Sequence, residues 1–180
     1  GLGSTFLEND TVLNELTEGI PEHGYLYNIP YRDGMADDFF STRWFVNTWN
    51  MLFPDKKVTG VKEIALRASN GDNNAQSLFE NFASNFVEFI TPFLLNFKPE
   101  KLIIGGNIAK ASDFFLDNIQ FQLKKLNLIT KIDICKLWDM SPLIGSAIYT
   151  SNILENMENT KEKRHTQQFI APTNSTATPS

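Results

Sequence analysis

The chain has 180 residues, a length that favours one domain and leaves room for two small ones. Hydrophobic residues make up 42% of it, with 15 Phe among them, so it can bury a substantial core. The formal net charge of -5, without a basic run, argues against nucleic-acid contacts. The single cysteine, Cys135, excludes an internal disulfide and a cysteine-rich zinc cluster. No apolar run approaches the ~20 residues of a membrane span and no signal pattern opens the chain, so we expect no membrane contact and a cytoplasmic location.

The first residues are small and match the kind that form phosphate-cradling turns, with uncovered backbone N–H groups and free hydroxyls. They are Gly1, Gly3, Ser4 and Thr5. A residual cloning glycine in front of a plain strand would give the same residues. Segments 4–8 and 11–16 are predicted to form a hairpin through the turn Glu8-Asn9-Asp10.

Glu22 and His23 follow in a stretch that Pro21 and Gly24 break too often for a helix. A carboxylate beside an imidazole can fix sugar hydroxyls by paired hydrogen bonds, or serve acid–base chemistry. Two solvated loop residues would give the same pattern, and both interpretations stay open.

A helix is predicted from about Ala36 to about Leu52, ended by Pro54. Asp37 and Asp38 lie in its first turn, where the helix dipole stabilises negative charge. Structural capping explains both carboxylates without any further role.

A short helix is predicted over Val61–Ser69, and the longest one begins at Asn73. Pro92 should kink or shorten the last turn of the long helix. Apolar residues recur along it at three- and four-residue steps, which indicates a core face. They are Phe79, Phe82, Phe86, Phe89, Ile90 and Phe93.

Residues 101–104 form a short apolar run that predicts a buried central strand, and Gly105 and Gly106 let the chain turn sharply at its carboxyl end. A helical pattern begins at Asn107. In open α/β sheets, ligands bind beyond the carboxyl ends of strands, and a following helix N-terminus favours negative charge. An ordinary strand-to-helix turn is the alternative.

Residues 108–126 predict an amphipathic helix, and Lys131–Leu137 alternates like a strand with one wet face. This order predicts a sheet covered by helices, with a right-handed crossover if the two strands are parallel. Ser141-Pro142 opens a last helix, in which Gly145 costs ~1 kcal/mol relative to Ala and so indicates close packing against backbone or ligand. Residues 157–180 have the composition of a linker or terminal extension.

In this order, the pieces resemble the C-terminal part of the ROK family of repressors, uncharacterised reading frames and sugar kinases. The strand that ends in Gly-Gly and the segment Ser-Pro-Leu-Ile-Gly-Ser-Ala at 141–147 carry the resemblance. It implies an α/β, ribonuclease-H-like lobe of the hexokinase, actin and Hsp70 superfamily, an actin-like ATPase domain with a mixed sheet covered by helices. We expect this lobe to span residues 1–156.

The resemblance also implies site residues. The Gly-Gly strand end and the final helix help to form the family's adenosine site, which implies nucleotide contacts at Gly105, Gly106, Asn107 and Gly145. The opening residues are similar to its second phosphate-binding turn, which implies phosphate contacts at Gly1, Gly3, Ser4 and Thr5.

Sugar contacts are implied by two further segments. Glu22-His23 resembles the family's Glu-x-Gly-His segment, although Glu and His are adjacent here. Residues 37–41 resemble its Glu-Asp-Tyr-Val-Ser segment, with Asp37 where the family has the sugar-contacting Glu. The family's Cys-rich zinc motif is absent, so we expect no zinc.

The implied function is the nucleotide- and sugar-contacting C-terminal lobe of an ATP-dependent, glucokinase-like hexose kinase that uses ATP and Mg²⁺. The family's Asp-x-Gly-Gly-Thr turn and catalytic aspartate belong to an N-terminal lobe, and this sequence supplies neither. We therefore expect a fragment that is inactive alone and contains no catalytic residue. Its partners would be a hexose, an adenine nucleotide and the missing lobe, with a homodimer left open. The alternative is a sugar-sensing, repressor-type or scaffold domain without kinase activity.

Overall fold

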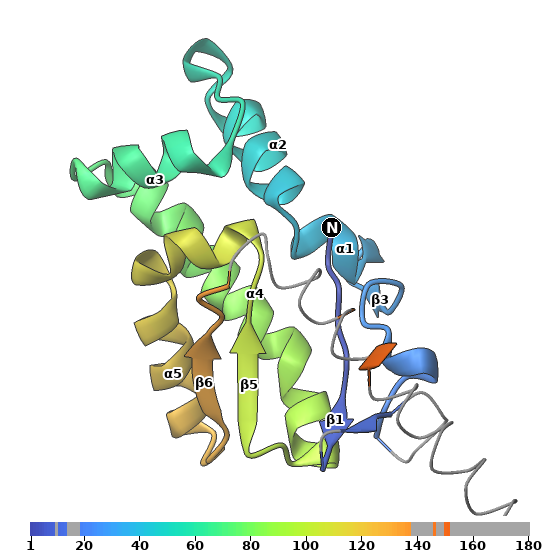
Figure 1. Cartoon of the computed structure of the whole chain (residues 1–180). Helices are drawn as coiled ribbons and strands as arrows, with labels where there is room; N and C mark the ends of the chain where they lie inside the picture. Colours follow the sequence, from blue (N-terminus) through green and yellow to red (C-terminus); the bar gives the residue numbers. More distant parts are fainter. Residues whose placement is uncertain (10, 14–18, 138–145, 147–149, 152–180) are drawn as a thin grey trace, which may run out of the picture. The chain divides into compact units, whose positions relative to one another are not determined.

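The computed structural model describes residues 1–9, 11–13, 19–137, 146, 150 and 151, and the chain divides into two compact units, Gly1–Trp138 and Asp139–Ser180. The first unit alternates short strands with helices (Figure 1). Its elements in chain order are β1 (Leu7–Glu8), β2 (Thr11–Val12), the 3-10 turn η1 (Glu22–Gly24), β3 (Pro30–Tyr31), β4 (Gly34–Met35), α1 (Ala36–Phe39), α2 (Thr42–Leu52), the 3-10 turn η2 (Pro54–Lys56), α3 (Val61–Ser69), α4 (Asn73–Phe97), β5 (Lys101–Ile104), the 3-10 helix η3 (Asn107–Phe114), α5 (Leu116–Lys125) and β6 (Lys131–Ile134).

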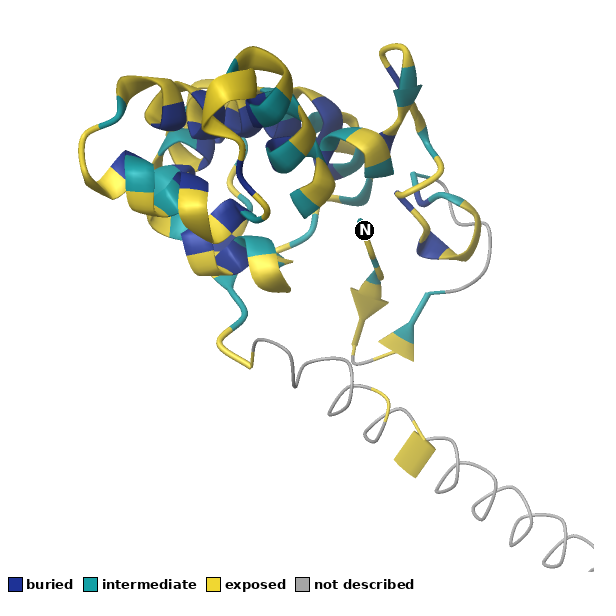
Figure 2. Cartoon of the chain, turned by 90° about the horizontal axis from the view of Figure 1, so that it is seen from above, coloured by how far each residue is buried: buried dark blue, intermediate teal, exposed yellow. Residues whose placement is uncertain are grey.

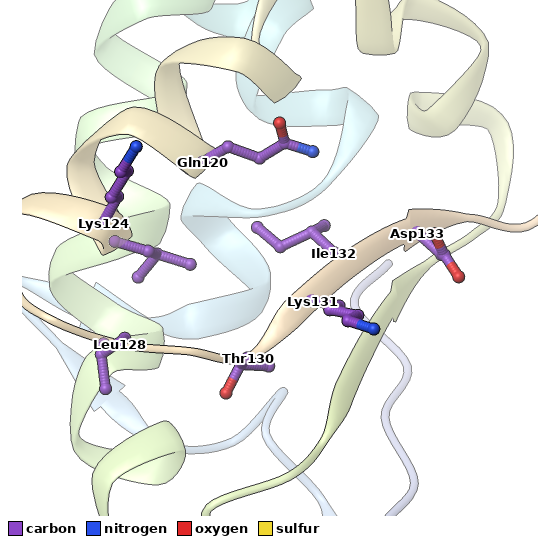
Figure 3. A pocket seen from close by; sticks show the side chains of 8 residues that line it. Gln120, Lys124, Leu128, Thr130, Lys131, Ile132 and Asp133 are labelled. Carbon is purple, nitrogen blue, oxygen red and sulfur yellow. The ribbon is translucent and has the colours of Figure 1, made fainter.

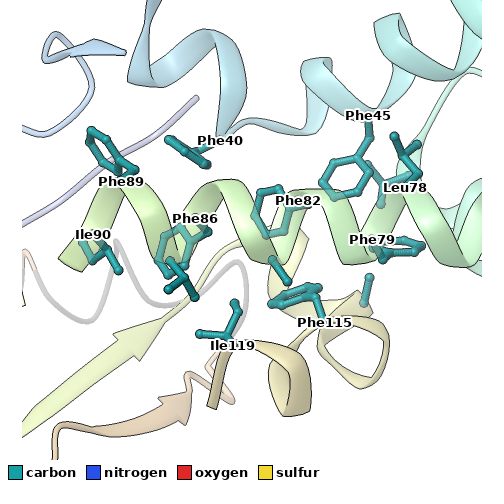
Figure 4. Close-up of a cluster of buried hydrophobic side chains, with 14 of the residues drawn as sticks. Phe40, Phe45, Leu78, Phe79, Phe82, Phe86, Phe89, Ile90, Phe115 and Ile119 are labelled. Atoms are coloured by element: carbon teal, nitrogen blue, oxygen red, sulfur yellow. The ribbon is translucent and has the colours of Figure 1, made fainter. Parts of the chain in front are cut away.

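Helix α4 is the element around which the core is built. Asp72 caps it, since its carboxylate accepts a hydrogen bond from the amide of Asn74 at 2.9 Å. Its apolar stripe packs against α1, α3 and α5, and buried residues concentrate on the facing sides of the helices (Figure 2). Aromatic rings fill the contact on either side of α4 (Figure 4). They are Phe40, Phe45, Phe79, Phe82, Phe86, Phe89 and Phe115.

Helix α4 continues past Pro92 to Phe97, so of the two outcomes predicted for this proline, a kink or a shorter last turn, the shorter turn does not occur. A proline inside a helix removes one donor and crowds the preceding turn. Here Phe89, Ile90 and Leu94, on either side of Pro92, are all buried in the core. Their burial stabilises the last turns by more than one lost hydrogen bond costs.

The predicted first helix is interrupted. Phe40 and Ser41 leave helical geometry, with Ser41 extended at φ -117° and ψ 162°, and α1 and α2 are therefore separate. The break allows Phe40 to stack on Phe89 at 4.9 Å while Phe45 on α2 packs against Phe82 at 4.9 Å. Tertiary packing of these rings overrides the continuous helical pattern.

The helix predicted over 108–126 also begins differently. Its first part is the 3-10 helix η3, and the α-helix proper starts at Leu116. The two successive rings Phe114 and Phe115 pack on different residues of α4, Phe79 at 5.0 Å and Phe82 at 5.2 Å. No α-helix N-terminus therefore follows the glycine pair directly.

Strands β5 and β6 pair in parallel, from Lys101 opposite Lys131 to Ile104 opposite Ile134 (Figure 1). A crossover connection between these strands was predicted from the sequence if they were parallel, and they are parallel. The expectation of a buried central strand is wrong for the described residues, because this sheet has two strands there and Ile103 is 59% exposed. Only one face, with the buried Ile132, packs against the helices.

The predicted hairpin forms, with Leu7 opposite Val12 and Glu8 opposite Thr11. Strand β1 is shorter than the predicted segment 4–8, and residues 14–16 of the second predicted segment lie outside the described residues. The prediction of Val61–Ser69 is confirmed residue for residue. The helix start at Ser141-Pro142, Gly145 and the extension 157–180 lie outside the described residues. No helix in the described part of the chain is long and apolar enough to cross a membrane.

Candidate functional site

Ser4 ties the start of the chain to the segment that follows η1. Its hydroxyl donates a hydrogen bond to the carbonyl oxygen of Gly24 at 2.7 Å and accepts one from the amide of Leu26 at 2.8 Å. The two bonds bracket Tyr25 and hold this backbone extended. A serine hydroxyl has one proton, so Ser4 cannot donate to a phosphate while it donates to Gly24.

Asp37 connects the same region to helices α1 and α2. Its Oδ1 accepts a hydrogen bond from the amide of Leu2, and its Oδ2 forms an ion pair with the guanidinium of Arg43. Its own amide donates to the carbonyl of Tyr27 at 3.1 Å. The Asp37 side chain is 24% exposed, so it remains reachable from solvent.

The two first-turn aspartates therefore differ in role. Asp38 Oδ2 accepts from the amide of Met35 at 3.0 Å, which is a capping bond at the start of α1. The Asp37 carboxylate instead bonds to residues outside α1, to Leu2 near the start of the chain and to Arg43 on α2. Capping thus accounts for Asp38 and not for the carboxylate of Asp37.

Glu22 and His23 lie exposed on η1. Glu22 Oε1 is 3.7 Å from His23 Nε2, and the two side chains are 76% and 59% exposed. Gly24, which follows, is buried at φ +70°, and a Cβ there would lie 3.2 Å from the ring of Phe6. Only glycine combines that backbone conformation with that contact.

Gly24 also indicates a different alignment of this segment with the family's sugar-binding pattern, one that the sequence analysis missed. In the pattern Glu-x-Gly-His, residues 22–25 match as Glu-His-Gly-Tyr. His23 then occupies the variable position and Tyr25 stands where the pattern has histidine. The glycine, whose conformation the structure requires, was the signal that could have revealed this alignment.

The remaining phosphate-turn candidates are Gly1, Gly3 and Thr5, and all three are exposed. A Cβ on Gly3 would meet nothing within 4 Å, whereas one on Gly1 would lie 3.0 Å from Asp37 Oδ1. The start of the chain therefore presents open backbone beside the Asp37 carboxylate. The structure brings the phosphate-turn and sugar candidates together around residues 24–27.

Three of the nucleotide candidates, Gly105, Gly106 and Asn107, follow the carboxyl end of β5. This strand pairs with β6 as far as the bond from the Cys135 amide to the Ile104 carbonyl at 2.8 Å. Gly106 has φ +73° and ψ -170°, a combination open essentially to glycine alone. Gly105 does not have a positive φ, and its Cβ would lie 3.4 Å from Cys135 Cβ. Asn107 is exposed, and its Oδ1 accepts from Lys110 Nζ at 2.8 Å.

A hollow of about 430 Å³ lies elsewhere, between α5 and β6 (Figure 3). It is lined by Gln120, Leu123, Lys124, Leu128, Thr130, Lys131, Ile132 and Asp133. None of the residues predicted to form a site lines it. In the ranges that the structure describes, no group of three or more His, Cys, Asp or Glu side chains could hold a metal ion.

Comparisons with known proteins agree with the fold. The structure is similar to that of a Cytophaga hutchinsonii protein provisionally described as a sugar kinase, with a TM-score of 0.65 and 14% identity. The similarity covers 79% of this chain and 52% of that one, so the chain spans about half the length of its structural relative. No curated protein matches. The model of the ROK family matches residues 34–152, which include Asp37 and the glycine pair and exclude residues 1–33. With two thirds of its length in that match, the chain belongs to the ROK family.

Proposed function

We propose that the chain is the nucleotide- and sugar-contacting C-terminal lobe of an ATP-dependent, glucokinase-like hexose kinase, with a ribonuclease-H-like fold and a cytoplasmic location. Membership of the ROK family supports the proposal, as does a fold similar to that of a protein provisionally described as a sugar kinase. The observation that carries it is the convergence of Leu2, Ser4, Asp37 and residues 24–27. These are the phosphate-turn and sugar segments that the family resemblance implies.

On the sugar side, carboxylates accept hydrogen bonds from ligand hydroxyls. Each oxygen of Asp37 has one contact in the structure, and a carboxylate oxygen has two lone pairs, so Asp37 retains capacity for a sugar hydroxyl. Arg43 and the Leu2 amide fix its orientation. Glu22 is exposed and free to rotate toward a ligand at the same segment.

On the nucleotide side, Gly105 and Gly106 offer backbone without side chains at the end of β5. A Cβ on Gly106 would meet nothing within 4 Å, so there is open space against which a flat base can lie. Bound ATP with Mg²⁺ would supply the phosphoryl group and neutralise its charge. Mg²⁺ is usually held by one or two carboxylates together with phosphate oxygens, so a protein cage of three ligands is not required.

Phosphoryl transfer depends on positioning both substrates across a cleft, and this sequence supplies neither a first phosphate turn nor a catalytic aspartate. The chain alone should therefore bind ligands weakly and transfer nothing. A coupled assay of the purified chain over a panel of hexoses tests this. Sugar-dependent ADP formation clearly above the blank would contradict the half-site proposal.

Binding tests the proposal directly. In an amide-resolved NMR titration of the chain with millimolar Mg·ATP, we expect shifts centred on residues 104–109. The variant Gly105→Val should weaken them, because it adds a branched side chain to the backbone that the base would approach, at a position without a strained φ. Lys62→Ala, on the exposed face of α3, is the control. Unchanged spectra at millimolar nucleotide would remove the adenine site from the proposal.

A sugar-sensing or repressor-type domain is the second candidate. The observation that favours it is Tyr25 in the histidine position of the sugar segment, together with an Asp37 carboxylate already engaged by Arg43 and Leu2. Such a domain would bind sugar without turnover. Phosphorylation of a hexose by the parent protein would favour the kinase lobe over the sugar-sensing domain.

A further inference from the structure

Three aromatic rings form a row on the surface beside Glu22. His23 and Tyr25 have ring centroids 5.6 Å apart, and Tyr25 and Tyr27 have centroids 5.5 Å apart. Each tyrosine is 44% exposed, whereas Leu26 between them is buried. The backbone at Tyr25 is extended, and the two tyrosines face solvent while Leu26 between them packs into the core. We call His23, Tyr25 and Tyr27 the aromatic row.

The backbone that carries the aromatic row is fixed. Ser4 bonds to the residues on both sides of Tyr25, and the Tyr27 carbonyl accepts the amide of Asp37. Tyrosine side chains have only two rotatable angles, so ordering them on binding costs little conformational entropy. A preorganised platform of this kind loses less free energy on binding than a mobile loop would.

Packing of the fold does not account for the row. Most phenylalanines of this chain lie in or against the core around α4, while these three rings touch one another at the surface. A single exposed aromatic residue needs no explanation, but a contiguous group beside a carboxylate indicates a binding surface.

The chemistry of the row fits a pyranose. Aromatic faces carry partial negative charge and attract polarised C–H groups, which a sugar ring presents on its apolar face. Tyrosine hydroxyls and Glu22 can hydrogen-bond to the hydroxyls at its edge. A six-membered sugar ring covers about one aromatic ring, so a row of three has room for more than one sugar unit.

We propose that the aromatic row is a stacking subsite that extends the sugar contact at Glu22 to a second pyranose unit, so that the preferred ligand is a glucose-type disaccharide or longer chain. The sugar contact at Glu22 itself rests on the proposed function. The stacking subsite rests on the ring geometry and can hold or fail separately.

The test is an NMR titration of the whole 180-residue chain with D-glucose, maltose and cellobiose. We expect at least one disaccharide to bind more tightly than glucose, with shifts at residues 22–28. Tyr27→Ala should weaken disaccharide binding about 2- to 10-fold, the range that one aromatic contact supplies, and should weaken glucose binding by a smaller factor. Tyr27→Phe should retain most of the disaccharide affinity, and Phe121→Ala, which removes an exposed ring on α5, should change nothing.

Equal affinities for glucose and both disaccharides, or the same loss in Phe121→Ala as in Tyr27→Ala, would overturn the subsite. So would binding of a proline-rich peptide across residues 23–27 in preference to any sugar, since aromatic surfaces also bind polyproline helices. The outcomes separate from those of the proposed function. A parent protein that phosphorylates no hexose, with the disaccharide effect of Tyr27→Ala intact, removes the kinase and keeps the subsite. If the parent protein phosphorylates a hexose and Tyr27→Ala does not change its disaccharide affinity, the kinase proposal stands and the stacking subsite is ruled out.

Discussion

Replacing Ser4 by alanine should destabilise the chain, because the hydroxyl holds two parts of the backbone together. It donates to the Gly24 carbonyl and accepts from the Leu26 amide, in a part-buried position. Alanine removes both bonds without adding volume. The carbonyl and the amide would then need water in a place where Leu26 is packed into the core.

The magnitude follows from the two bonds, at 2.7 and 2.8 Å. A hydrogen bond contributes about 0.5–1.5 kcal/mol net, so the loss of both should lower the free energy of unfolding by about 1–3 kcal/mol. For a chain of this length, each kcal/mol shifts the melting temperature by about 2–4 °C. Ser4→Ala should therefore melt about 2–12 °C below the original chain.

Thermal unfolding followed by circular dichroism measures the shift, with Thr5→Val as the matched control. Thr5 is the next residue and is exposed, so its variant should melt within about 2 °C of the original, as surface substitutions usually do. Amide exchange at Leu26 should accelerate in Ser4→Ala alone. If Ser4→Ala melts like the original chain but loses affinity for Mg·ATP, then Ser4 is a phosphate ligand and does not hold the two backbone segments together.

Three further predictions concern the core and titrating groups. Phe45→Ala should cost about 3–5 kcal/mol, because the side chain is fully buried among other rings; chemical denaturation that shows less than 1 kcal/mol would contradict this core. Hydrogen bonds donated by Arg32 and, to a smaller extent, by Tyr31 hold the pKa of Glu88 below its usual range. The small stabilisation from Glu88 is therefore present at neutral pH and is lost as pH falls through that lowered pKa. Glu88→Gln should flatten the acid limb of the stability curve, and an unchanged limb would refute the contact. Burial first, and then the hydrogen bond to Glu88, raise the pKa of Tyr31 from 10.0 to about 12, so stability should fall as pH rises through that interval, and Tyr31→Phe should remove this fall in an alkaline denaturation series.

Local signals in the sequence were sufficient for the elements that have clear ends. Val61–Ser69 is punctuated by Gly60 before it and by Asn70-Gly71 after it, and its bounds were predicted correctly. The start of α4 was also predictable from the sequence, because Asp72 is a strong N-cap. At these helix ends, the conformation is determined by residues within a few positions of the end.

Features set by distant contacts were not predictable in this way. The break at Ser41 depends on how Phe40 packs against Phe89, which is 49 positions further on. One partner of the Asp37 carboxylate, the amide of Leu2, is also remote, since it lies 35 positions earlier in the chain. Periodicity carries no information about such pairings, so the sequence proposed Asp37 as a site residue without indicating what would orient it.

In the described residues, the β5–β6 pair lacks the cover that parallel strands usually have. Parallel strands normally occur in sheets that are covered on both faces, and they pair slightly less stably than antiparallel strands. Here Ile103 is 59% exposed on the outer face, and the ion pair between Lys101 and Asp133 on that face is exposed to solvent. An exposed ion pair adds little stability, so it does not replace the missing apolar cover. The proposed ribonuclease-H-like lobe would resolve this imbalance, because a mixed sheet covered by helices would bury Ile103 on its outer face. The glycine pair would then lie at the carboxyl edge of a complete sheet, where a nucleotide site has rigid support.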